Sequence, residues 1–425
     1  MNEQNQSLAR SWVVVMTAGA FFFYSFIQMT LFSTEAMKEY FMATLSLDDP
    51  ATFGNFAGTF LYGTVLFLIP IGVLLDRIAV KTLILAMIGV VVACVFGLTF
   101  TTNVYVAMAL RFLTGIAHCV AFMAPFRLAP RWFASRHLAL VAGLLVTFAV
   151  FGGWVSGTPM LALITALGGK TTMLINGALG IAIFVLALVF LRDFPAGYKA
   201  EADAGPSLSL LEGLRVAARN KQNWLAGLYI GLLNLSVLVL GAVWGTTYLR
   251  FVNSDLSEAT FTGIVGMIFI GTMIGSPVCG WISDRLKTRK WSMFGGAVLS
   301  LAVMLAIMFP PSTGSGLFYV LFLLLGVLTA AQTIGYPVIA ESNEDKVLGT
   351  ANGLAAVVLM GMGAIGQPLF GQLVAWFGGG PDATPDQLQA AFRSAIWVMP
   401  IAFIGAVVCA LLVDETFRRE DTHED

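Results

Sequence analysis

Charged side chains are scarce in this sequence of 425 residues. Asp, Glu, Lys and Arg together make up 11% of it, whereas soluble domains carry about 25%, and hydrophobic residues reach 58%. A chain with so little charge cannot cover the surface of a soluble globule. The composition therefore excludes a soluble protein and indicates one that lies in a lipid bilayer.

Basic clusters, cysteine and histidine are few as well. The net charge is −1 and no basic run exceeds two residues, which argues against a nucleic-acid partner. The four cysteines all fall within apolar stretches, where disulfides and metal ligation are not expected. The three histidines form no His-x-x-Glu-His motif, and the sequence contains no phosphate-binding loop. We therefore expect neither an enzyme nor a bound metal or cofactor.

The sequence contains long apolar runs instead of charged residues. A helix needs about 20 residues to cross the hydrocarbon core of a bilayer. By this measure we predict twelve transmembrane helices, near residues 12–34, 53–76, 82–100, 104–126, 137–162, 171–191, 223–249, 259–283, 291–309, 315–339, 348–376 and 391–413. The predicted fold class is an all-α, multi-pass membrane protein with its helices in two six-helix bundles.

Lys and Arg are distributed unevenly over the predicted loops. An even number of spans places both termini on one side, and the side richer in Lys and Arg is the cytoplasmic one. With the termini on that side, 18 of the 23 basic residues fall in cytoplasmic segments and four in outer segments, while Arg111 alone lies within a span. We therefore expect both termini in the cytoplasm. The short loops favour a bacterial inner membrane.

One polar stretch divides the chain. Residues 193–222 separate a first bundle, residues 1–192, from a second bundle, residues 223–425, and we interpret them as a cytoplasmic linker. The end of this linker has an apolar helical face. That face consists of Leu210, Leu211, Leu214 and Val216. It suits either a helix lying on the membrane surface or a regulatory docking site.

A short charged signature occurs twice. GVLLDRIAVK begins at Gly72 and GWISDRLKTRK at Gly280, so matching residues lie 208 positions apart. Each copy separates two predicted spans, and internal repeats of this kind are typical of secondary transporters. Asp76 and Asp284 lie at helix ends, where a carboxylate can accept backbone N–H bonds or meet a cation of the other half.

The paired signatures, the six-plus-six layout and the linker together resemble the major facilitator superfamily of secondary transporters. The residues that match the superfamily's Gly-x-x-x-Asp-Arg loop pattern are Gly72, Asp76 and Arg77 in the first copy and Gly280, Asp284 and Arg285 in the second. The resemblance implies two pseudo-symmetric six-helix bundles that give alternating access to a site between them. It also implies a conformational latch formed by Asp76, Arg77, Asp284 and Arg285. The alternative is that these are ordinary orienting charges on short loops.

The predicted helix 104–126 carries polar side chains inside the membrane. An intramembrane charge costs about 2.5–3.5 kcal/mol, so Arg111 needs compensation from water or an anion. His118 lies seven residues further and returns to nearly the same face, with Thr114 between them. We predict that Arg111, Thr114 and His118 line a substrate site. The alternatives are that Arg111 extends to the membrane surface and that His118 bonds to a neighbouring helix.

The first predicted helix carries a second polar face, with Tyr24, Gln28 and Glu35. Tyr24 and Gln28 are further candidates for the substrate site. Glu35 is a candidate proton carrier, unless it only pairs with Lys38 near the outer boundary. The second half offers neutral candidates, for which helix packing is the alternative. These are Trp244, Thr333 and Tyr336, with Asn234, Thr246, Thr247 and Gln332 nearby.

A cation in the first half and neutral or aromatic residues in the second favour a small organic anion or zwitterion as substrate, such as a carboxylate or an amino-acid-like nutrient. Proton coupling needs a group whose charge changes, and His118 and Glu35 are the candidates. We therefore expect a monomeric, proton-coupled secondary transporter. A multidrug/proton antiporter that exports lipophilic compounds and a non-transporting membrane sensor are the alternatives.

Overall fold

The computed structural model describes residues 3–133, 135–195, 210–252, 256–310, 314–380 and 382–417. These residues form helices and connecting loops, and no strand occurs among them. Within the described ranges, twelve helical segments are long and apolar enough to cross a membrane. The prediction of an all-α protein with twelve spans is therefore confirmed.

The helices follow one another along the chain in two sets. The first set is α1 (Glu3–Met29), α2 (Glu35–Leu45), α3 (Pro50–Arg77), α4 (Val80–Phe100), α5 (Val104–Trp132), α6 (Ser135–Ser156), α7 (Thr158–Leu167) and α8 (Gly169–Phe190). The second set is α9 (Leu210–Arg219), α10 (Lys221–Leu235), α11 (Gly245–Val252), α12 (Glu258–Leu286), α13 (Lys290–Met308), α14 (Ser315–Thr329), α15 (Gly335–Glu341), α16 (Asp345–Trp376), α17 (Pro385–Ala395) and α18 (Val398–Leu412). A π-helix over Ser236–Trp244 joins α10 to α11, and a 3-10 turn over Ala330–Ile334 joins α14 to α15.

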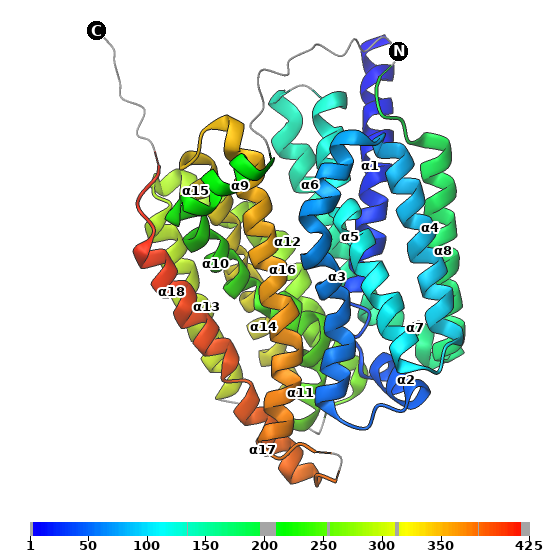
Figure 1. Ribbon diagram of the computed structural model, residues 1–425. Helices are drawn as coiled ribbons and strands as arrows, with labels where there is room; N and C mark the ends of the chain where they lie inside the picture. Colours follow the sequence, from blue (N-terminus) through cyan, green and yellow to red (C-terminus); the bar gives the residue numbers. More distant parts are fainter. Residues whose placement is uncertain are drawn as a thin grey trace.

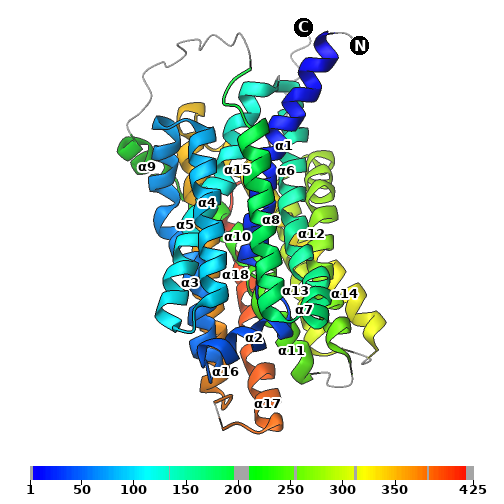
Figure 2. The ribbon, with the colours of Figure 1, turned by 90° about the vertical axis from the view of Figure 1, so that its right-hand side faces the viewer.

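The two sets lie side by side, with α1–α8 in one group and α10–α18 in the other (Figure 1). Helix α3 packs against α16 along the boundary, and α6 packs against α12. Figure 2 shows that α1 begins at the end of the bundle that lies farthest from α2 and α17. We call the end where α1 begins the terminal face, and the end with α2 and α17 the opposite face. The predicted bundle boundaries stay a prediction, because linker residues 196–209 lie outside the described residues.

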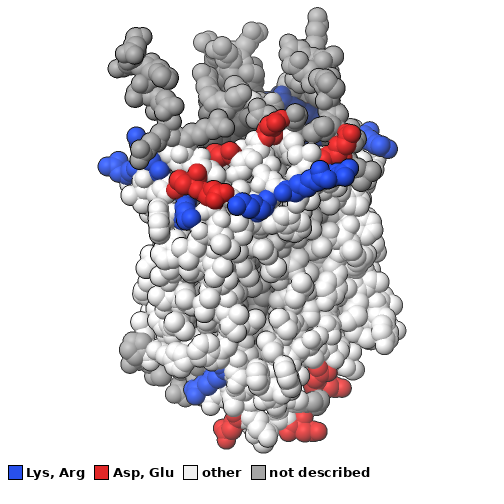
Figure 3. All heavy atoms as spheres, turned by 60° about the vertical axis from the view of Figure 1, so that its left-hand side comes forward, with Lys and Arg blue, Asp and Glu red and all other residues white. Residues whose placement is uncertain are grey.

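Charged side chains gather at the two ends of the molecule. Figure 3 shows a rim of Lys, Arg, Asp and Glu at the terminal face, a few charges at the opposite face, and an almost uncharged belt between them. Large apolar side chains are exposed along the spans, Leu66 and Ile401 among them. An apolar surface of this extent suits contact with lipid and would promote aggregation in water.

The first predicted helix is shorter than expected. Helix α1 ends at Met29, and a turn leads to the separate helix α2, which begins at Glu35. The side chain of Thr34 caps α2 by accepting a hydrogen bond from a backbone N–H in its first turn. The prediction that Glu35 shares a helix face with Tyr24 and Gln28 is therefore wrong, because a new helix with its own axis begins between them.

The described end of the linker is helix α9, which packs on the start of α16. Ala217 of α9 is fully buried, and its backbone oxygen accepts a hydrogen bond from Asn223 of α10 at 2.9 Å. Val216, which belongs to the predicted apolar face, is 48% exposed. Helix α9 is thus held to the second half, and contact of its apolar face with the membrane stays a prediction.

Candidate functional site

A cavity of about 740 Å³ lies between the two halves. Helices α1, α3, α5 and α6 line it from the first half, and α10, α12, α15 and α16 line it from the second. It extends from Met29, at the end of α1, to Leu75, in the last turn of α3, and Gly349, near the start of α16. The latter two residues lie toward the terminal face, so the cavity reaches that face of the molecule.

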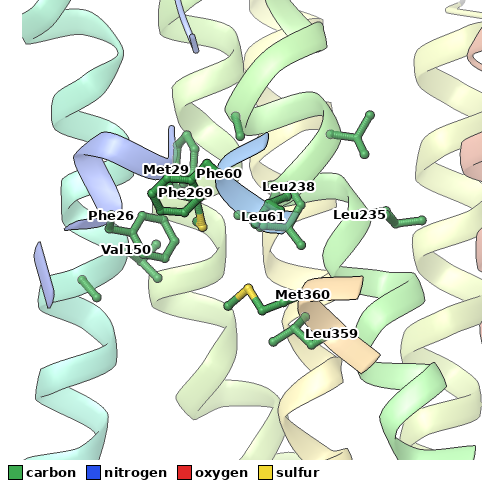
Figure 4. Packing of buried hydrophobic residues seen from close by; sticks show 14 of the residues in the cluster. Phe26, Met29, Phe60, Leu61, Val150, Leu235, Leu238, Phe269, Leu359 and Met360 are labelled. Atoms are coloured by element: carbon green, nitrogen blue, oxygen red, sulfur yellow. The ribbon is translucent and has the colours of Figure 1, made fainter. Parts of the chain in front are cut away.

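Apolar side chains of both halves gather around Met29, which lines the cavity (Figure 4). Figure 4 shows the rings of Phe26, Phe60 and Phe269 gathered beside Met29. Phe269 belongs to α12 of the second half, yet it lies against Gly153 of α6 in the first half. A Cβ atom on Gly153 would lie 2.6 Å from the Phe269 ring, so the absence of a side chain there allows the two halves to touch.

Polar side chains join the halves nearer the opposite face. The Lys38 ammonium donates to Thr246 Oγ1 at 2.9 Å, and that hydroxyl donates to Glu35 at 2.8 Å. The backbone N–H of Ala36 donates to Glu258 at 2.7 Å. We call the charged and hydroxyl residues of this region the opposite-face cluster. It consists of Glu35, Lys38 and Glu39 from the first half and Thr246, Thr247, Arg250 and Glu258 from the second.

Glu35 and Lys38 form a buried ion pair in this cluster, with exposed fractions of 6% and 3%. Burial by itself raises the pKa of Glu35, but the charge of Lys38 and hydrogen bonds from Lys38, Thr247 and Thr246 outweigh it, so the pKa of this carboxyl lies below its usual range. Burial lowers the pKa of the Lys38 ammonium. Glu35 is therefore ionised at neutral pH while the cluster is closed.

His118 faces the cavity from α5. Its Nδ1 lies 2.8 Å from Ser25 Oγ, a hydrogen bond that joins α5 to α1. Its ring lies near those of Phe22 and Phe60, with centroid distances of 6.1 Å and 5.3 Å. Nε2 is buried and has no hydrogen-bond partner among the described residues. The bond to Ser25 fixes the ring, and Nε2 is left to donate or accept a hydrogen bond from a ligand, according to the tautomer.

Arg111 lies nearer the opposite face, is 1% exposed, and is not among the described residues that line the cavity. Its guanidinium donates to the Gln28 backbone oxygen at 2.6 Å and lies over the rings of Phe32 and Phe60, 4.8 Å and 5.0 Å from their centroids. Gln28 is in the last turn of α1, where carbonyl groups lack intrahelical partners. Arg111 therefore caps this helix end, and its contact with a substrate stays a prediction.

The other first-half candidates bond within their own half. Tyr24 donates to the Asn176 backbone oxygen at 3.1 Å, and the side-chain amides of Gln28 and Asn176 bond to each other at 3.0 and 3.2 Å. The Thr114 hydroxyl donates to the Leu110 oxygen at 2.8 Å. Tyr24, Gln28 and Thr114 are absent from the described lining of the cavity. Helical spacing could not show this, because it does not tell which face of a helix is turned toward the other half.

The second-half candidates divide between the cavity and the region near the opposite face. Thr333 and Tyr336 line the cavity. Beside them, the side-chain amide of Gln332 donates to Asn234 Oδ1 at 3.0 Å, and both of these residues line the cavity too. Trp244 lies elsewhere, since it is buried and its Nε1 donates to a backbone oxygen of α16 at 3.0 Å.

Arg127 is a cavity residue that the sequence prediction missed. The predicted helix ends at residue 126, which leaves Arg127 in a loop, whereas α5 continues to Trp132. Among the described lining residues, Arg127 is the only Lys or Arg, and none is Asp or Glu. The signal in the sequence that could have extended the predicted helix is the pair of apolar residues directly after Arg127, Leu128 and Ala129.

The predicted latch residues lie at the terminal face, at the ends of α3 and α12. Asp284 accepts a hydrogen bond from Arg289 at 2.6 Å, and Arg285 lies over a tryptophan ring of its own helix, so both bond within the second half. Arg77 is exposed, and the side chain of Asp76 lies outside the described residues. A latch between the halves therefore stays a prediction.

The described lining of the cavity includes polar groups that can form hydrogen bonds with a ligand. Its polar lining includes a guanidinium, an imidazole, amides and hydroxyls. Within the described ranges, no group of three His, Cys, Asp or Glu residues could hold a metal ion. The four cysteines are buried and unpaired.

Solved transporter structures share this fold. A bacterial homologue of the human lysosomal transporter Spinster, in an inward-facing and unoccupied conformation, matches with a TM-score of 0.73 and 15% sequence identity, over 95% of each chain. The nucleoside transporter NupG matches with a TM-score of 0.69 and 15% identity, over 92% of this chain and 99% of its own. At such identity the likeness concerns the fold alone.

Several bacterial transporters are similar in sequence. Two Agrobacterium vitis proteins are named for tartrate transport. One is 27% identical over 59% of this chain and 59% of its own length. The other is 26% identical over 58% of this chain and 61% of its own length. A gentisate transporter of Corynebacterium glutamicum is 23% identical over 77% of this chain and 73% of its own. A gallate transporter of Pseudomonas putida is 25% identical over 60% of this chain and 63% of its own.

The model of one protein family matches most of the chain. It is that of the Major Facilitator Superfamily, and it matches residues 14–327 and again residues 235–424. The family and the relatives above are transporters, so the prediction of a transporter and not an enzyme is confirmed. The chain belongs to the Major Facilitator Superfamily, as the paired Gly-x-x-x-Asp-Arg signatures indicated.

Proposed function

We propose that this protein is a secondary transporter of small organic anions, which bind in the cavity beside Arg127. The observation that carries this proposal is the polar lining of the cavity, whose described part includes the guanidinium of Arg127, the imidazole of His118 and side-chain amides, all of which can donate hydrogen bonds to an anion. A guanidinium binds a carboxylate through two parallel hydrogen bonds. Tartrate, gentisate and gallate, for which relatives are named, are organic anions as well.

Transport proceeds by alternating access in this proposal. The cavity reaches the terminal face, while the opposite-face cluster and the apolar contact at Phe269 join the halves on the other side. Moving the anion across the membrane requires these contacts to break and the terminal face to close. The excess of Lys and Arg at the terminal face supports a cytoplasmic location for it, in the inner membrane of a bacterium.

Protons supply the driving force, with His118 as the coupling residue. An imidazole changes charge between pH 5 and 8 more readily than other side chains. His118 lines the cavity and has one nitrogen without a partner among the described residues. The other candidate, Glu35, is ionised at neutral pH by its pairing with Lys38, which favours a structural role for it.

Binding to the purified protein tests the anion proposal. Thermal stability is measured with carboxylates, sugar phosphates, neutral sugars and lipophilic cations. A ligand at 100 times its dissociation constant stabilises a protein by about 2.7 kcal/mol. We expect carboxylates to stabilise the protein and Arg127→Gln to abolish this effect. Arg131→Gln is the matched control, because Arg131 is on the same helix but outside the described lining.

The same screen includes Arg111→Gln, because Arg111 is the cation predicted from the sequence. Loss of carboxylate binding in Arg111→Gln alone would move the anion site to Arg111. Stabilisation only by lipophilic cations would contradict the anion proposal and support export of lipophilic compounds. Carboxylate binding without uptake into proteoliposomes would support a non-transporting sensor.

A further inference from the structure

Ser25 of α1 and His118 of α5 form a buried hydrogen-bonded pair. Both residues have an exposed fraction of 0%, and Ser25 Oγ lies 2.8 Å from His118 Nδ1. Among the described residues, the Ser25 hydroxyl has no other hydrogen-bond partner, and His118 Nε2 has none at all. The neutral pair carries two polar protons, one on the hydroxyl and one on the imidazole, but the bond between the two side chains uses only one of them.

These two protons can be arranged in two ways. In the first arrangement the Ser25 hydroxyl donates to Nδ1, and the imidazole proton is on Nε2. In the second arrangement Nδ1 carries the imidazole proton and donates to Ser25 Oγ, which leaves the hydroxyl proton without an acceptor among the described residues. The arrangements therefore differ in the place of the unpaired proton, which is on His118 Nε2 in the first and on Ser25 in the second.

The position of the cavity distinguishes the two arrangements. His118 lines the cavity, whereas Ser25 is absent from the described lining. A ligand in the cavity can thus accept a hydrogen bond from His118 but not from Ser25. A buried donor without an acceptor is destabilising, so with an anion in the cavity only the first arrangement gives both protons an acceptor.

The side chains beside the imidazole do not supply that acceptor. The rings recorded against it belong to Phe22 and Phe60, which have no hydrogen-bonding group. Nε2 is buried and has no partner among the described residues. An acceptor atom of the ligand is therefore the group that would complete the hydrogen bonding of this pair.

We propose that Ser25 is a positioning residue, which donates to Nδ1 and so holds the neutral His118 imidazole with its proton on Nε2, where it donates to the carboxylate of the transported anion. This inference rests on the proposed function. In this tautomer Nε2 is a donor and not an acceptor. Ser25 thus makes this part of the site selective for ligands that present a hydrogen-bond acceptor, such as a carboxylate, over ligands that present only donors, such as an ammonium group.

Nitrogen NMR of the full-length protein with isotope-labelled histidine tests the tautomer. The chemical shift of an imidazole nitrogen depends on whether it carries a proton, and spectra at about pH 8 are recorded well above the usual histidine pKa of about 6.5. The chain has three histidines, and the His118 signals are those that disappear in His118→Gln. We expect a protonated Nε2 and an unprotonated Nδ1 in the parent protein, and a larger share of the other tautomer in Ser25→Ala.

Titrations at the same pH test the consequence for binding. The probes are tartrate, gentisate and gallate, for whose transport relatives are named. Ser25→Ala should weaken binding about threefold to tenfold, because the donor at Nε2 is no longer fixed, and Ser25→Thr should restore binding because it keeps the hydroxyl. Thr17→Ala is the matched control, since it removes a hydroxyl of the same helix that bonds to the Val13 backbone oxygen. Melting curves without ligand check that each variant is folded.

A proton on Nδ1 in the parent protein, or the same tautomer and the same affinities in Ser25→Ala as in the parent, would overturn this inference and leave transport of organic anions intact. Equal weakening by Thr17→Ala and Ser25→Ala would assign the effect to the packing of α1 and overturn the positioning role. Failure of all three anions to bind the parent protein would overturn the proposed function and the donation from Nε2 to a carboxylate, while the NMR spectra decide the tautomer independently of any ligand.

Discussion

The backbone N–H of Ala36 in the first half donates a hydrogen bond to the carboxylate of Glu258 in the second half, at 2.7 Å. Ala36 lies in the first turn of α2, where backbone N–H groups lack intrahelical partners. Glu258 therefore binds the positive end of a helix in the other half. Together with the buried pair of Glu35 and Lys38, this contact joins the halves near the opposite face.

Glu35→Gln should open the opposite face. The variant keeps the size of the side chain but removes the negative charge beside the buried Lys38. Hydrogen bonds to charged groups contribute about 1.5–3 kcal/mol, so the ratio of closed to open molecules should fall about tenfold or more. The measurement is the distance between spin labels at Ala43→Cys in α2 and Ala390→Cys in α17, which are both exposed, while the four native cysteines are buried.

Glu39→Gln is the matched control for that variant. Glu39 also pairs with the second half, through Arg250, but its side chain is 59% exposed, and exposed pairs contribute about 0–1 kcal/mol. In Glu39→Gln the distance between the spin labels on α2 and α17 should therefore equal the distance in the parent protein. If both variants open the face equally, the net charge of α2 controls opening and the buried pair does not.

Acid should open the opposite face as well. Burial raises the pKa of Glu35, but Lys38, Thr247 and Thr246 outweigh it, so the pKa in the closed state lies below its usual value of about 4.3. Opening takes Thr246 and Thr247 away from Glu35, so the Glu35 carboxylate binds a proton more readily in the open state than in the closed state. Glu35 therefore stabilises the closed state fully above about pH 4.3, and this stabilisation is lost as the pH falls through the closed-state pKa.

The same spin labels follow this pH dependence between pH 7 and pH 3. The other charged groups that face Glu35 are Lys38 and Glu39 on α2, Arg250 on α11 and Glu258 on α12. Subtracting the curve of Glu35→Gln isolates the contribution of Glu35. An acid transition of equal size in that variant would show that Glu35 is not the titrating group, and Glu258, whose pKa burial raises, would be tested next.

Gly115→Ala should destabilise the first half. A Cβ atom on Gly115 of α5 would lie 1.8 Å from the Phe60 backbone oxygen of α3, so the two helices would have to separate. Overpacking costs about 1–3 kcal/mol, which lowers the unfolding temperature measured in detergent. Gly89→Ala in α4 is the control, because no atom lies within 4 Å of its Cβ position. Identical unfolding temperatures for the two variants would contradict the close contact of α3 and α5.

His118→Gln should uncouple transport from protons. Glutamine can still bond to Ser25, but it does not titrate, so accumulation driven by a pH gradient should be abolished while counterflow exchange continues. Both are measured with the same labelled carboxylate in proteoliposomes. Ser25→Ala is the companion variant, and it should retain coupling because the imidazole is kept. Normal accumulation by His118→Gln would exclude His118 as the coupling residue.

The transmembrane helices could be predicted from the sequence because the surrounding bilayer restricts the backbone to helix there. Within a bilayer every backbone N–H and C=O group needs a partner inside the chain, so an apolar run of about 20 residues must form a helix. Helix ends were less certain, because local capping and packing decide them. Thr34 begins a new helix at Glu35, and α5 continues past residue 126 because Leu128 and Ala129 are buried.

The candidate site was predicted only in part. His118, Thr333 and Tyr336 line the cavity, whereas Tyr24, Gln28 and Thr114 bond within the first half. Helical periodicity tells which residues share a face, but not what that face contacts. A polar face turned toward a helix of the same half and one turned toward a cavity look alike in a sequence.

Apolar runs, the repeat at 208 positions and the bias of Lys and Arg are properties of single segments, and they suffice for the helices, the duplication and the predicted orientation. The pairing of Glu35 with Thr246 across the halves, the capping of α1 by Arg111 and the place of Arg127 in the cavity depend on how helices distant in sequence rotate and tilt against each other. That rotation minimises the free energy of all side-chain contacts together, so only the packed tertiary structure decided which of the three arginines of α5 meets the cavity.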